Sequence, residues 1–416
     1  MKERLFTKDF TLVVIGQIIS LFGNAAVRFA LPLYLLNQTG SSALYGTVMA
    51  CAFIPSILLS PVGGMIADRV NKRNIMVVLD FTTAALLLGY LMLQGRVNLV
   101  FLLTVTLMLL FGIAGAYQPA VQASIPALVG QEHYMQANAV INIVSSFAAL
   151  LGPVFGGILY SIYGLLPILE VGMACFVLSA VMEIFITIPY KKQEKKGSIW
   201  KIMGQDIKES FCFIRKEKPF IGKGLVVICC VNLFFSALIN VGLPYLVTEV
   251  LPFTDSLANR LYGYAQGALA AGGIVGGIGA GILAQKLQVK KVGNLLGIAA
   301  LCLFPVGISL LLAESEMVVY LILTVCCFVI MVMATVFTIQ IMAFVQTETP
   351  QHLVGKVIAL CMMLSMCAQP FGNAMYGFLF EICAGHEAVV VLAAGVISFA
   401  VAIWARKVFS AQSASE

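Results

Sequence analysis

The feature that most constrains this chain is a succession of twelve long apolar runs. Of its 416 residues, 61% are hydrophobic and 11% are charged, a composition that excludes a soluble domain with a polar surface. An apolar run of about 20 residues spans the hydrocarbon core of a bilayer as a helix. The sequence therefore predicts an all-α polytopic membrane protein of twelve transmembrane helices. They are expected near residues 10–36, 44–66, 74–94, 98–121, 137–161, 165–188, 221–248, 261–284, 292–313, 317–343, 354–381 and 387–405.

The positions of the basic residues predict the orientation of these helices. Most of the 25 lysines and arginines lie at the two termini and in every second link, whereas the opposite links hold only Arg96 and Arg260. Because cytoplasmic loops carry an excess of lysine and arginine, both termini are expected on the cytoplasmic side of the cell (inner or plasma) membrane. The apolar stretch after Lys2 and Arg4 is too long for a cleavable signal, so the first helix is expected to stay. The net charge of +6 then reflects this topology and the anionic inner leaflet, not a nucleic-acid partner.

The sequence offers little that enzyme chemistry needs. The 3 histidines fall in links, and the chain has neither a G-x-x-x-x-G-K-[ST] phosphate loop nor a plausible Ser-His-Asp grouping. The 11 cysteines form no C-x-x-C pair, so disulfide or metal roles are not expected. We therefore expect no enzyme, no cofactor and no metal site, and an ATP-driven pump is disfavoured.

The two halves of the chain repeat each other. A single offset aligns Leu44-Tyr45-Gly46 with Leu261-Tyr262-Gly263, and Pro153 with Pro370. This predicts two pseudo-symmetric six-helix bundles at residues 1–189 and 221–416, joined by a cytoplasmic linker at 190–220. Within the linker, residues 199–213 space apolar side chains among charges, as an amphipathic helix on the inner surface does; a regulatory or partner-binding role is the alternative.

The first run carries a polar stripe. Gln17, Ser20, Asn24 and Arg28 are spaced three, four and four residues apart, so they share one face of a helix. A polar stripe facing lipid is costly, and we expect it to face a watery cavity. Hydrogen bonding between helices of the bundle is the alternative.

The link between the second and third runs is unusually charged for a short turn. Its motif residues are Gly64, Asp68, Arg69, Lys72 and Arg73. In this position of a duplicated twelve-span chain, the motif resembles the signature loop of the major facilitator superfamily. The resemblance implies a gate that closes the cytoplasmic side in the outward-facing state, with Asp68 at a helix N-terminus near basic partners, where a carboxylate is favoured. The alternative is ordinary inner-surface charge with one compensating acid.

Two details of this loop bear on its role. Asn71 stands where relatives commonly have glycine, and asparagine tolerates positive φ, so the turn is expected to survive. The repeat places Gln285 opposite Asp68. An acidic latch is therefore expected in the first half alone.

The fifth run contains a second motif. Gly152, Pro153, Gly156 and Gly157 resemble the antiporter signature of drug-exporting members of the superfamily, which is linked to export. Relatives have two further glycines where this chain has Ala148 and Ala139. Close helix packing by small residues is the alternative explanation.

Leu31-Pro32-Leu33 and Thr39-Gly40-Ser41 close the first run, and Leu243-Pro244 lies in the seventh. With these features the chain resembles, over its full length, the macrolide-efflux branch of that superfamily. The central path of the superfamily is lined by spans one, four, seven and ten. The resemblance, together with the amides and hydroxyls of these and neighbouring spans, implies a mostly apolar cavity with few charges, suited to a bulky amphipathic ligand. The expected cavity residues are Gln17, Ser20, Asn24, Arg28, Tyr117, Gln118, Gln122, Asn142, Asn232, Ser236, Asn240, Gln340 and Asn373.

Proton coupling needs a group that can change its protonation state, and acids inside the membrane are the usual candidates. Asp80 and Glu183 lie within the third and sixth runs, and we expect either to take part together with Asp68. The alternative is that they pair with loop cations near the inner surface.

The sequence thus indicates a monomeric secondary transporter, surrounded by lipid, that exports a lipophilic drug-like compound in exchange for protons by alternating access. Uptake or facilitated passage of a small metabolite is the second hypothesis. A non-transporting membrane receptor or assembly protein is the third.

Overall fold

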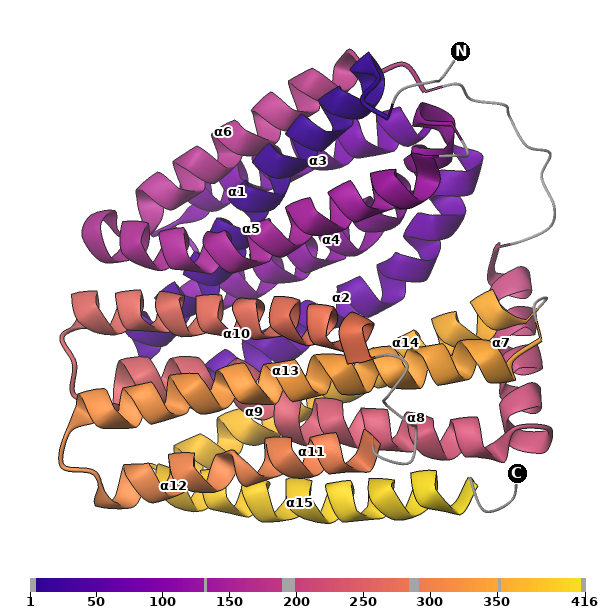
Figure 1. Ribbon diagram of the computed structural model, residues 1–416. Helices are drawn as coiled ribbons and strands as arrows, with labels where there is room; N and C mark the ends of the chain where they lie inside the picture. The colour runs from indigo at the N-terminus through magenta and orange to yellow at the C-terminus, as the bar shows by residue number, and fades with distance from the viewer. Residues whose placement is uncertain (1–4, 131–132, 189–198, 284–291, 351–352, 413–416) are drawn as a thin grey trace. The chain divides into compact units, whose positions relative to one another are not determined.

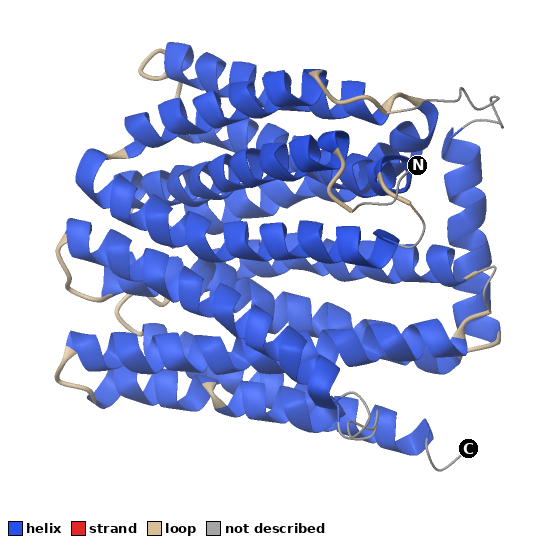
Figure 2. Cartoon of the chain, turned by 45° about the horizontal axis from the view of Figure 1, so that its top comes forward, coloured by secondary structure: helices blue, strands red, loops and turns tan. Residues whose placement is uncertain are grey.

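The regular secondary structure of the described residues is entirely helical. A computed structural model describes residues 5–130, 133–188, 199–283, 292–350 and 353–412, and no strand occurs among them (Figures 1 and 2). It contains 12 helical segments long and apolar enough to cross a membrane. The predicted all-α, twelve-span architecture is therefore confirmed.

The helices follow the expected runs closely. Those of the first half are α1 (Lys8–Thr39), α2 (Ser42–Arg69), α3 (Lys72–Leu93), α4 (Leu99–Leu128), α5 (Tyr134–Tyr163) and α6 (Leu165–Ile184). A linker helix, α7 (Ile199–Lys216), follows them. The second half has α8 (Pro219–Val231), η2 (Asn232–Ser236), α9 (Ala237–Tyr245), η3 (Leu246–Val250), α10 (Asp255–Leu283), α11 (Val292–Leu301), α12 (Leu303–Leu312), α13 (Glu316–Glu348), α14 (Val354–Ile382) and α15 (Glu387–Gln412).

Packing divides the chain into two compact units. Unit 1 comprises Met1–Gly40, Cys51–Lys196 and Thr254–Gly267, and unit 2 comprises Ser41–Ala50, Gly197–Phe253 and Ala268–Glu416. The start of α2 thus belongs to unit 2, and the start of α10 belongs to unit 1. The boundaries expected from the sequence, 1–189 and 221–416, remain a prediction about the evolutionary halves.

Unit 1 is built around α1, which packs against α4, α5 and α6, while α3 packs against α4 and α6. Small residues allow α1 and α6 to approach closely. A Cβ on Gly23 of α1 would lie 2.8 Å from Cys175 Cβ, and one on Gly172 of α6 would lie 2.5 Å from Val27 Cγ2. At this close approach, Ser179 Oγ of α6 donates a hydrogen bond of 3.1 Å to the carbonyl oxygen of Gly16 on α1.

Unit 2 contains interruptions that the apolar pattern does not reveal. The seventh span changes from α-helix to π-helix at η2 and again at η3, and the ninth span is broken at Cys302. Tyr376 Oη of α14 donates a hydrogen bond of 3.0 Å to the carbonyl oxygen of Phe234 within η2. A π-turn shifts carbonyls out of the α-helical ladder, and this bond satisfies one of them.

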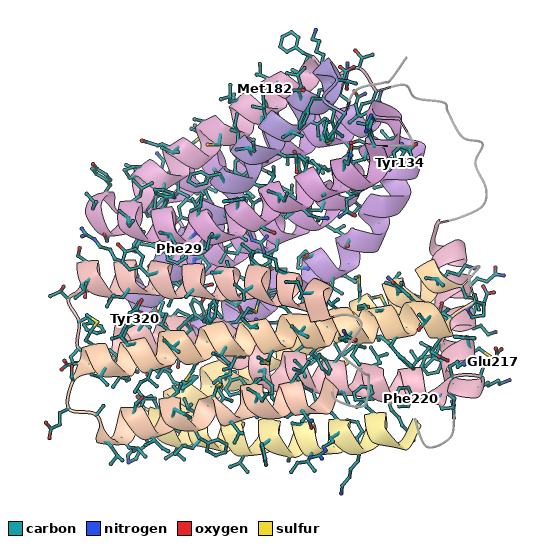
Figure 3. The ribbon with its side chains drawn as sticks, viewed as in Figure 1. Phe29, Tyr134, Met182, Glu217, Phe220 and Tyr320 are labelled. Carbon is teal, nitrogen blue, oxygen red and sulfur yellow. The ribbon has the colours of Figure 1, made fainter. Side chains whose placement is uncertain are left out.

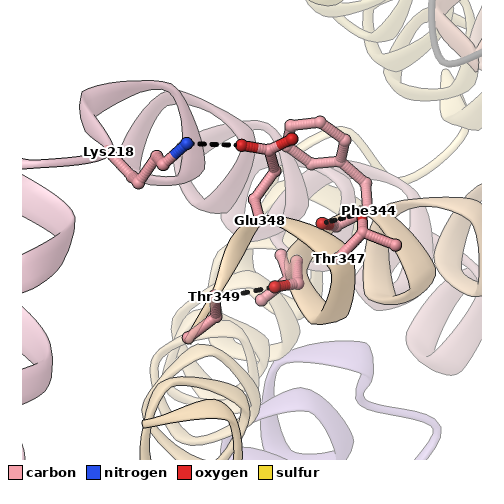
Figure 4. A network of polar contacts seen from close by, with 6 residues as sticks. Lys218, Phe344, Thr347, Glu348 and Thr349 are labelled. Carbon is pink, nitrogen blue, oxygen red and sulfur yellow. Dashed lines mark hydrogen bonds and ion pairs between the residues drawn. The ribbon is translucent and has the colours of Figure 1, made fainter. Parts of the chain in front are cut away.

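Charged pairs at the ends of two spans connect α7 and the residues just after it with the rest of unit 2. Lys356 Nζ lies 2.7 Å from Glu209 Oε2, and Ser210 and Ile214 are buried. Just after α7, Lys218 Nζ lies 2.6 Å from Glu348 Oε2 at the end of α13 (Figure 4). The expected amphipathic segment is thus a helix with one buried side.

Candidate functional site

The polar stripe of α1 points into unit 1. Gln17 is fully buried and Ser20 is 4% exposed. Gln17 Nε2 donates a hydrogen bond of 2.7 Å to Tyr117 Oη on α4, and Ser20 Oγ donates one of 3.0 Å to Asp80 Oδ1 on α3. Gln17 and Ser20 of the stripe therefore each donate a hydrogen bond to a polar side chain of a neighbouring helix.

Both acids proposed for proton coupling lie in this network. Asp80 is 3% exposed and Glu183 is fully buried. Tyr117 Oη donates a hydrogen bond of 2.7 Å to Glu183 Oε1. Gln17, Ser20, Asp80, Tyr117 and Glu183 are called the acid network below.

The acid network holds its carboxyl groups with neutral partners. Among the described residues neither Asp80 nor Glu183 forms an ion pair, and Asp80 Oδ2, Glu183 Oε2 and Gln17 Oε1 have no hydrogen-bond partner. Burying a carboxylate is costly unless it is paired and fully hydrogen-bonded. A carboxyl oxygen left free in the interior is available to carry a proton.

A cavity adjoins the acid network within unit 1. It has a volume of about 80 Å³, enough for a few water molecules, and it is polar enough to hold them. Its lining comprises Ser20, Leu21, Asn24, Arg28, Asp80, Thr83, Ile113, Ala114, Tyr117, Gln118 and Phe176. Five of the residues expected in the substrate cavity therefore meet here, and Gln17 joins them through Tyr117.

Arg28 is the cation of this cavity. Its guanidinium carbon lies 3.6 Å from the centre of the Phe111 ring, so the positive charge is stabilised by the face of an aromatic side chain. No ion pair of Arg28 occurs within the described ranges. The fork of N–H donors is available to an oxygen-bearing ligand.

Other expected cavity residues lie elsewhere. Gln122 and Asn142 are exposed, Asn232 Nδ2 donates a 3.1 Å hydrogen bond to the carbonyl of Ile228 in its own span, and Asn373 is fully buried with no partner for either amide atom among the described residues. Ser236, Asn240 and Gln340 are partly buried in unit 2. The structure brings the first-half candidates together far more tightly than the second-half ones.

The charged loop is described only in part. Gly64, Asp68 and Arg69 lie in the last turns of α2, but the surroundings of Gly64 and the side chains of Asp68 and Arg69 are not described. Lys72 begins α3, and Arg73 Nη1 donates a 3.5 Å hydrogen bond to the carbonyl oxygen of Ile184 at the end of α6.

Asn71 stabilises this turn through its side chain, and not through the positive φ that the sequence suggested. Its φ is −61°, and its Oδ1 accepts a 3.0 Å hydrogen bond from Arg73 N. Asn71 is thus the N-cap of α3, a role that asparagine fills well because its side chain satisfies a free helix N–H.

The glycines of the fifth span lie at tight helix crossings. A Cβ on Gly152 would collide with Ala25 of α1, and one on Gly156 would lie 3.2 Å from Phe29 Cδ1 (Phe29 is labelled in Figure 3). A Cβ on Gly157 would lie 2.8 Å from the carbonyl oxygen of Asn259 at the start of α10. α5 runs unbroken through Pro153. The motif therefore packs α5 closely against α1 and α10.

The same kind of crossing occurs in unit 2. A Cβ on Gly157 or Gly263 would face the other glycine's Cα at 3.0–3.2 Å, and the corresponding distances for Gly46 and Gly377 are 2.8–3.0 Å. The start of α10 on α5 and the start of α2 on α14 are thus equivalent contacts, one in each unit.

Sequence reasoning missed two features of these sites. One is Tyr117 as the direct partner of Glu183, although the tyrosine was a cavity candidate. The other is Glu381, whose Oε2 accepts hydrogen bonds from Ser41 Oγ at 2.9 Å and from Ala43 N at 3.2 Å and so caps α2. The serine pair before an apolar run is an N-cap signal, but the sequence gives no sign that the acid comes from α14.

The family is decided by comparison with known proteins. A family model described as "Major Facilitator Superfamily" matches residues 13–373. The chain belongs to this superfamily. It is therefore a multi-pass membrane transporter and not an enzyme.

Two relatives within the superfamily have names that refer to efflux. Macrolide efflux protein A of Streptococcus pyogenes is 23% identical over 369 residues, covering 87% of each chain. Multidrug efflux pump Tap of Mycobacterium tuberculosis is 21% identical over 399 residues, covering 93% of this chain and 90% of the relative.

A solved superfamily structure supports the fold. The crystal structure of the nucleoside transporter NupG aligns with a TM-score of 0.75 at 12% sequence identity and covers 97% of this chain and 99% of that one. At this identity the likeness concerns the fold alone.

Proposed function

We propose that this transporter exports lipophilic, drug-like compounds of the macrolide type in exchange for protons, by alternating access. The observation that carries the proposal is the acid network: two buried carboxyl groups without a cationic partner among the described residues, beside a polar cavity. Such groups can bind and release protons during a transport cycle. The efflux relatives support export as the direction.

Each part of unit 1 has a role in this proposal. Asp80 and Glu183 carry the protons, and Asn24, Arg28 and Gln118 contact polar atoms of the substrate. The apolar remainder of the path accommodates the rest of a bulky molecule, because apolar surface dominates ligand sites. Gly152, Gly156 and Gly157 keep α5 closely packed so that the proton path does not leak.

The charged loop is proposed as the cytoplasmic gate. Asp68 holds this gate shut in the outward-facing state with Arg69, Lys72 and Arg73, and Gly64 permits close helix approach. Neutralising Asp68 together with Arg69 and Arg73 is expected to change the accessibility of a cysteine label in the cavity to reagents added from either side. An unchanged labelling pattern would remove the gate from the proposal.

The orientation proposed from the basic residues places both termini in the cytoplasm, with the protein acting as a monomer in the cell membrane. Export then moves the compound outward while protons enter. Protein in vesicles of known orientation distinguishes this from the reverse.

The test is accumulation of a macrolide and of a cationic dye in a pump-deficient bacterial host, with and without a protonophore. Lower accumulation that the protonophore reverses supports export driven by protons. Higher accumulation supports uptake, the second candidate, which the shared fold of a nucleoside transporter keeps open. No change for any compound contradicts transport of this class.

A further inference from the structure

The two acids of the network differ in their access to the cavity. Asp80 lines the cavity, whereas Glu183 does not. Within the described residues, Tyr117 is the side chain that both lines the cavity and hydrogen-bonds Glu183. Any proton that travels between the cavity and Glu183 along these contacts passes the phenol of Tyr117.

The phenol is held in one orientation. Gln17 Nε2 lies 2.7 Å from Tyr117 Oη and donates to it, while the hydroxyl donates to Glu183 Oε1, also at 2.7 Å. A phenol oxygen has two acceptor sites and one proton. The glutamine occupies one acceptor site, and the second is left for a donor on the cavity side.

We infer that Tyr117 relays protons between the cavity and Glu183, with Asp80 as the acid that exchanges directly with cavity water. This rests on the proton exchange proposed above and adds an order to it. Asp80 gains or loses its proton first, and the proton then moves to or from Glu183 through the tyrosine.

The relay moves one proton from the cavity to Glu183. The Tyr117 O–H bond breaks as its proton moves to Glu183 Oε1, and the phenol oxygen takes a proton from a cavity water that the Asp80 carboxylic acid has protonated. Tyr117 is neutral before and after, Glu183 becomes neutral, and the cavity loses one proton. Rotation of the hydroxyl restores the starting geometry.

The charges around this path come from several helices. Asp80 on α3, Tyr117 on α4 and Arg28 on α1 line the same cavity. Tyr117 donates a hydrogen bond to Glu183 on α6, and Arg73 donates one to the carbonyl oxygen of Ile184, the residue after Glu183. Transfer between the acids therefore takes place in a site that already contains one fixed cation.

The test follows the two carboxyl groups directly and needs no substrate. Purified protein in lipid nanodiscs is subjected to a rapid pH change, and time-resolved infrared spectroscopy records the carboxylic C=O bands, assigned with Asp80→Asn and Glu183→Gln. We expect Tyr117→Phe to slow the Glu183 band by about tenfold or more, since a positioned proton-transfer group contributes at least that much, and to leave the Asp80 band unchanged.

Tyr90→Phe is the matched control. Tyr90 is also a buried tyrosine of unit 1, and its hydroxyl has no hydrogen-bond partner in the described structure. Removing it is expected to change neither band. If Tyr117→Phe likewise leaves the Glu183 band at its normal rate, the relay is wrong while proton-driven export can still stand.

A second variant keeps size and hydrogen bonding. Fluorotyrosine placed at position 117 alters the proton affinity of the phenol and is expected to change the rate of the Glu183 band; the same replacement at position 90 is not. An unchanged rate at position 117 overturns the relay even if Tyr117→Phe fails to fold. If neither band responds to pH in the unaltered protein, both the relay and the proposed proton exchange are wrong.

Discussion

The interiors of unit 1 and unit 2 are lined by very different side chains. Unit 1 has a cavity of about 80 Å³ that contains Asp80 and Arg28. Two cavities of unit 2, of about 20 and 10 Å³, are lined by leucine, isoleucine, valine, phenylalanine, glycine and cysteine. In the spans of the second half, acids occur only within a turn of an end: Glu249, Asp255, Glu316, Glu348, Glu381 and Glu387.

Equivalent helix packing in the two units is therefore not accompanied by equivalent buried chemistry. The two glycine crossings, Gly157 with Gly263 and Gly46 with Gly377, are equivalent in the two units. The buried titratable groups are not. Changes in packing should therefore act alike in both units, and changes of charge should act mainly in unit 1.

Export should decrease most when both carboxyl groups of the acid network are replaced by amides. Asp80→Asn combined with Glu183→Gln is expected to abolish protonophore-sensitive export, because neither amide can take up and release the transported proton. Dye export from vesicles with an imposed pH gradient measures this. Glu170→Gln, which changes an exposed acid on the same helix as Glu183, is the control and should export normally. Normal export by the double variant would show that the buried acids of unit 1 do not carry the transported proton.

A smaller effect is expected from the cavity cation. Arg28→Leu should raise the substrate concentration needed for half-maximal export by about tenfold or more, since a hydrogen bond to a charged group contributes about 1.5–3 kcal/mol. The half-maximal concentration of Arg28→Lys should lie between those of the unaltered protein and Arg28→Leu, because lysine keeps the charge without the planar stack on Phe111. Asn232→Leu in unit 2 loses a bond within its own span and is expected to change export less. An equal loss for Asn232→Leu would mean that both units bind substrate alike.

Packing changes should be similar in the two units. Gly157→Val and Gly377→Val are each expected to lower the free energy of unfolding by about 1–3 kcal/mol, because a side chain has no room at these crossings. Thermal unfolding in detergent measures both. Gly277→Ala is the control, since a Cβ there meets nothing within 4 Å. A large difference between the two valine variants would show that the crossings are not equivalent.

The smallest effects are expected at the surface of unit 2. Glu348→Gln and Glu209→Gln each break an ion pair whose lysine is partly exposed, 43% for Lys218 and 37% for Lys356. Solvated pairs contribute about 0–1 kcal/mol, so thermal unfolding should barely shift. A drop in Glu209→Gln as large as that of the glycine variants would show that the attachment of α7 is essential to unit 2.

Sequence reasoning predicted the elements of this fold better than their contacts. The twelve spans follow from apolar length, and the stripe of Gln17, Ser20, Asn24 and Arg28 follows from helical periodicity. Periodicity fixes which residues share a face but not which neighbouring helix that face meets. The bond from Tyr117 to Glu183 depends on the rotation of α4 and α6, which no local pattern encodes.

Local departures from regular helix were equally hidden. The π-turns of the seventh span and the break at Cys302 lie inside runs that are uniformly apolar. Their stabilising contacts come from other helices, as the bond from Tyr376 to Phe234 shows. The sequence pattern of a single span therefore does not predict these contacts.

The membership of Thr254–Gly267 in unit 1 has a consequence for biosynthesis. Chains are made from the N-terminus, and domains generally fold as they emerge. Asn37 Nδ2 donates a 3.0 Å hydrogen bond to Asn259 Oδ1, and Phe29 stacks on Tyr262 with ring centres 4.8 Å apart. The ribosome has already passed the linker and the seventh span before these partners exist. The nascent first bundle therefore stays incompletely packed in the membrane until residues 254–267 are synthesised. A chain that ends at the linker would lack this segment of unit 1.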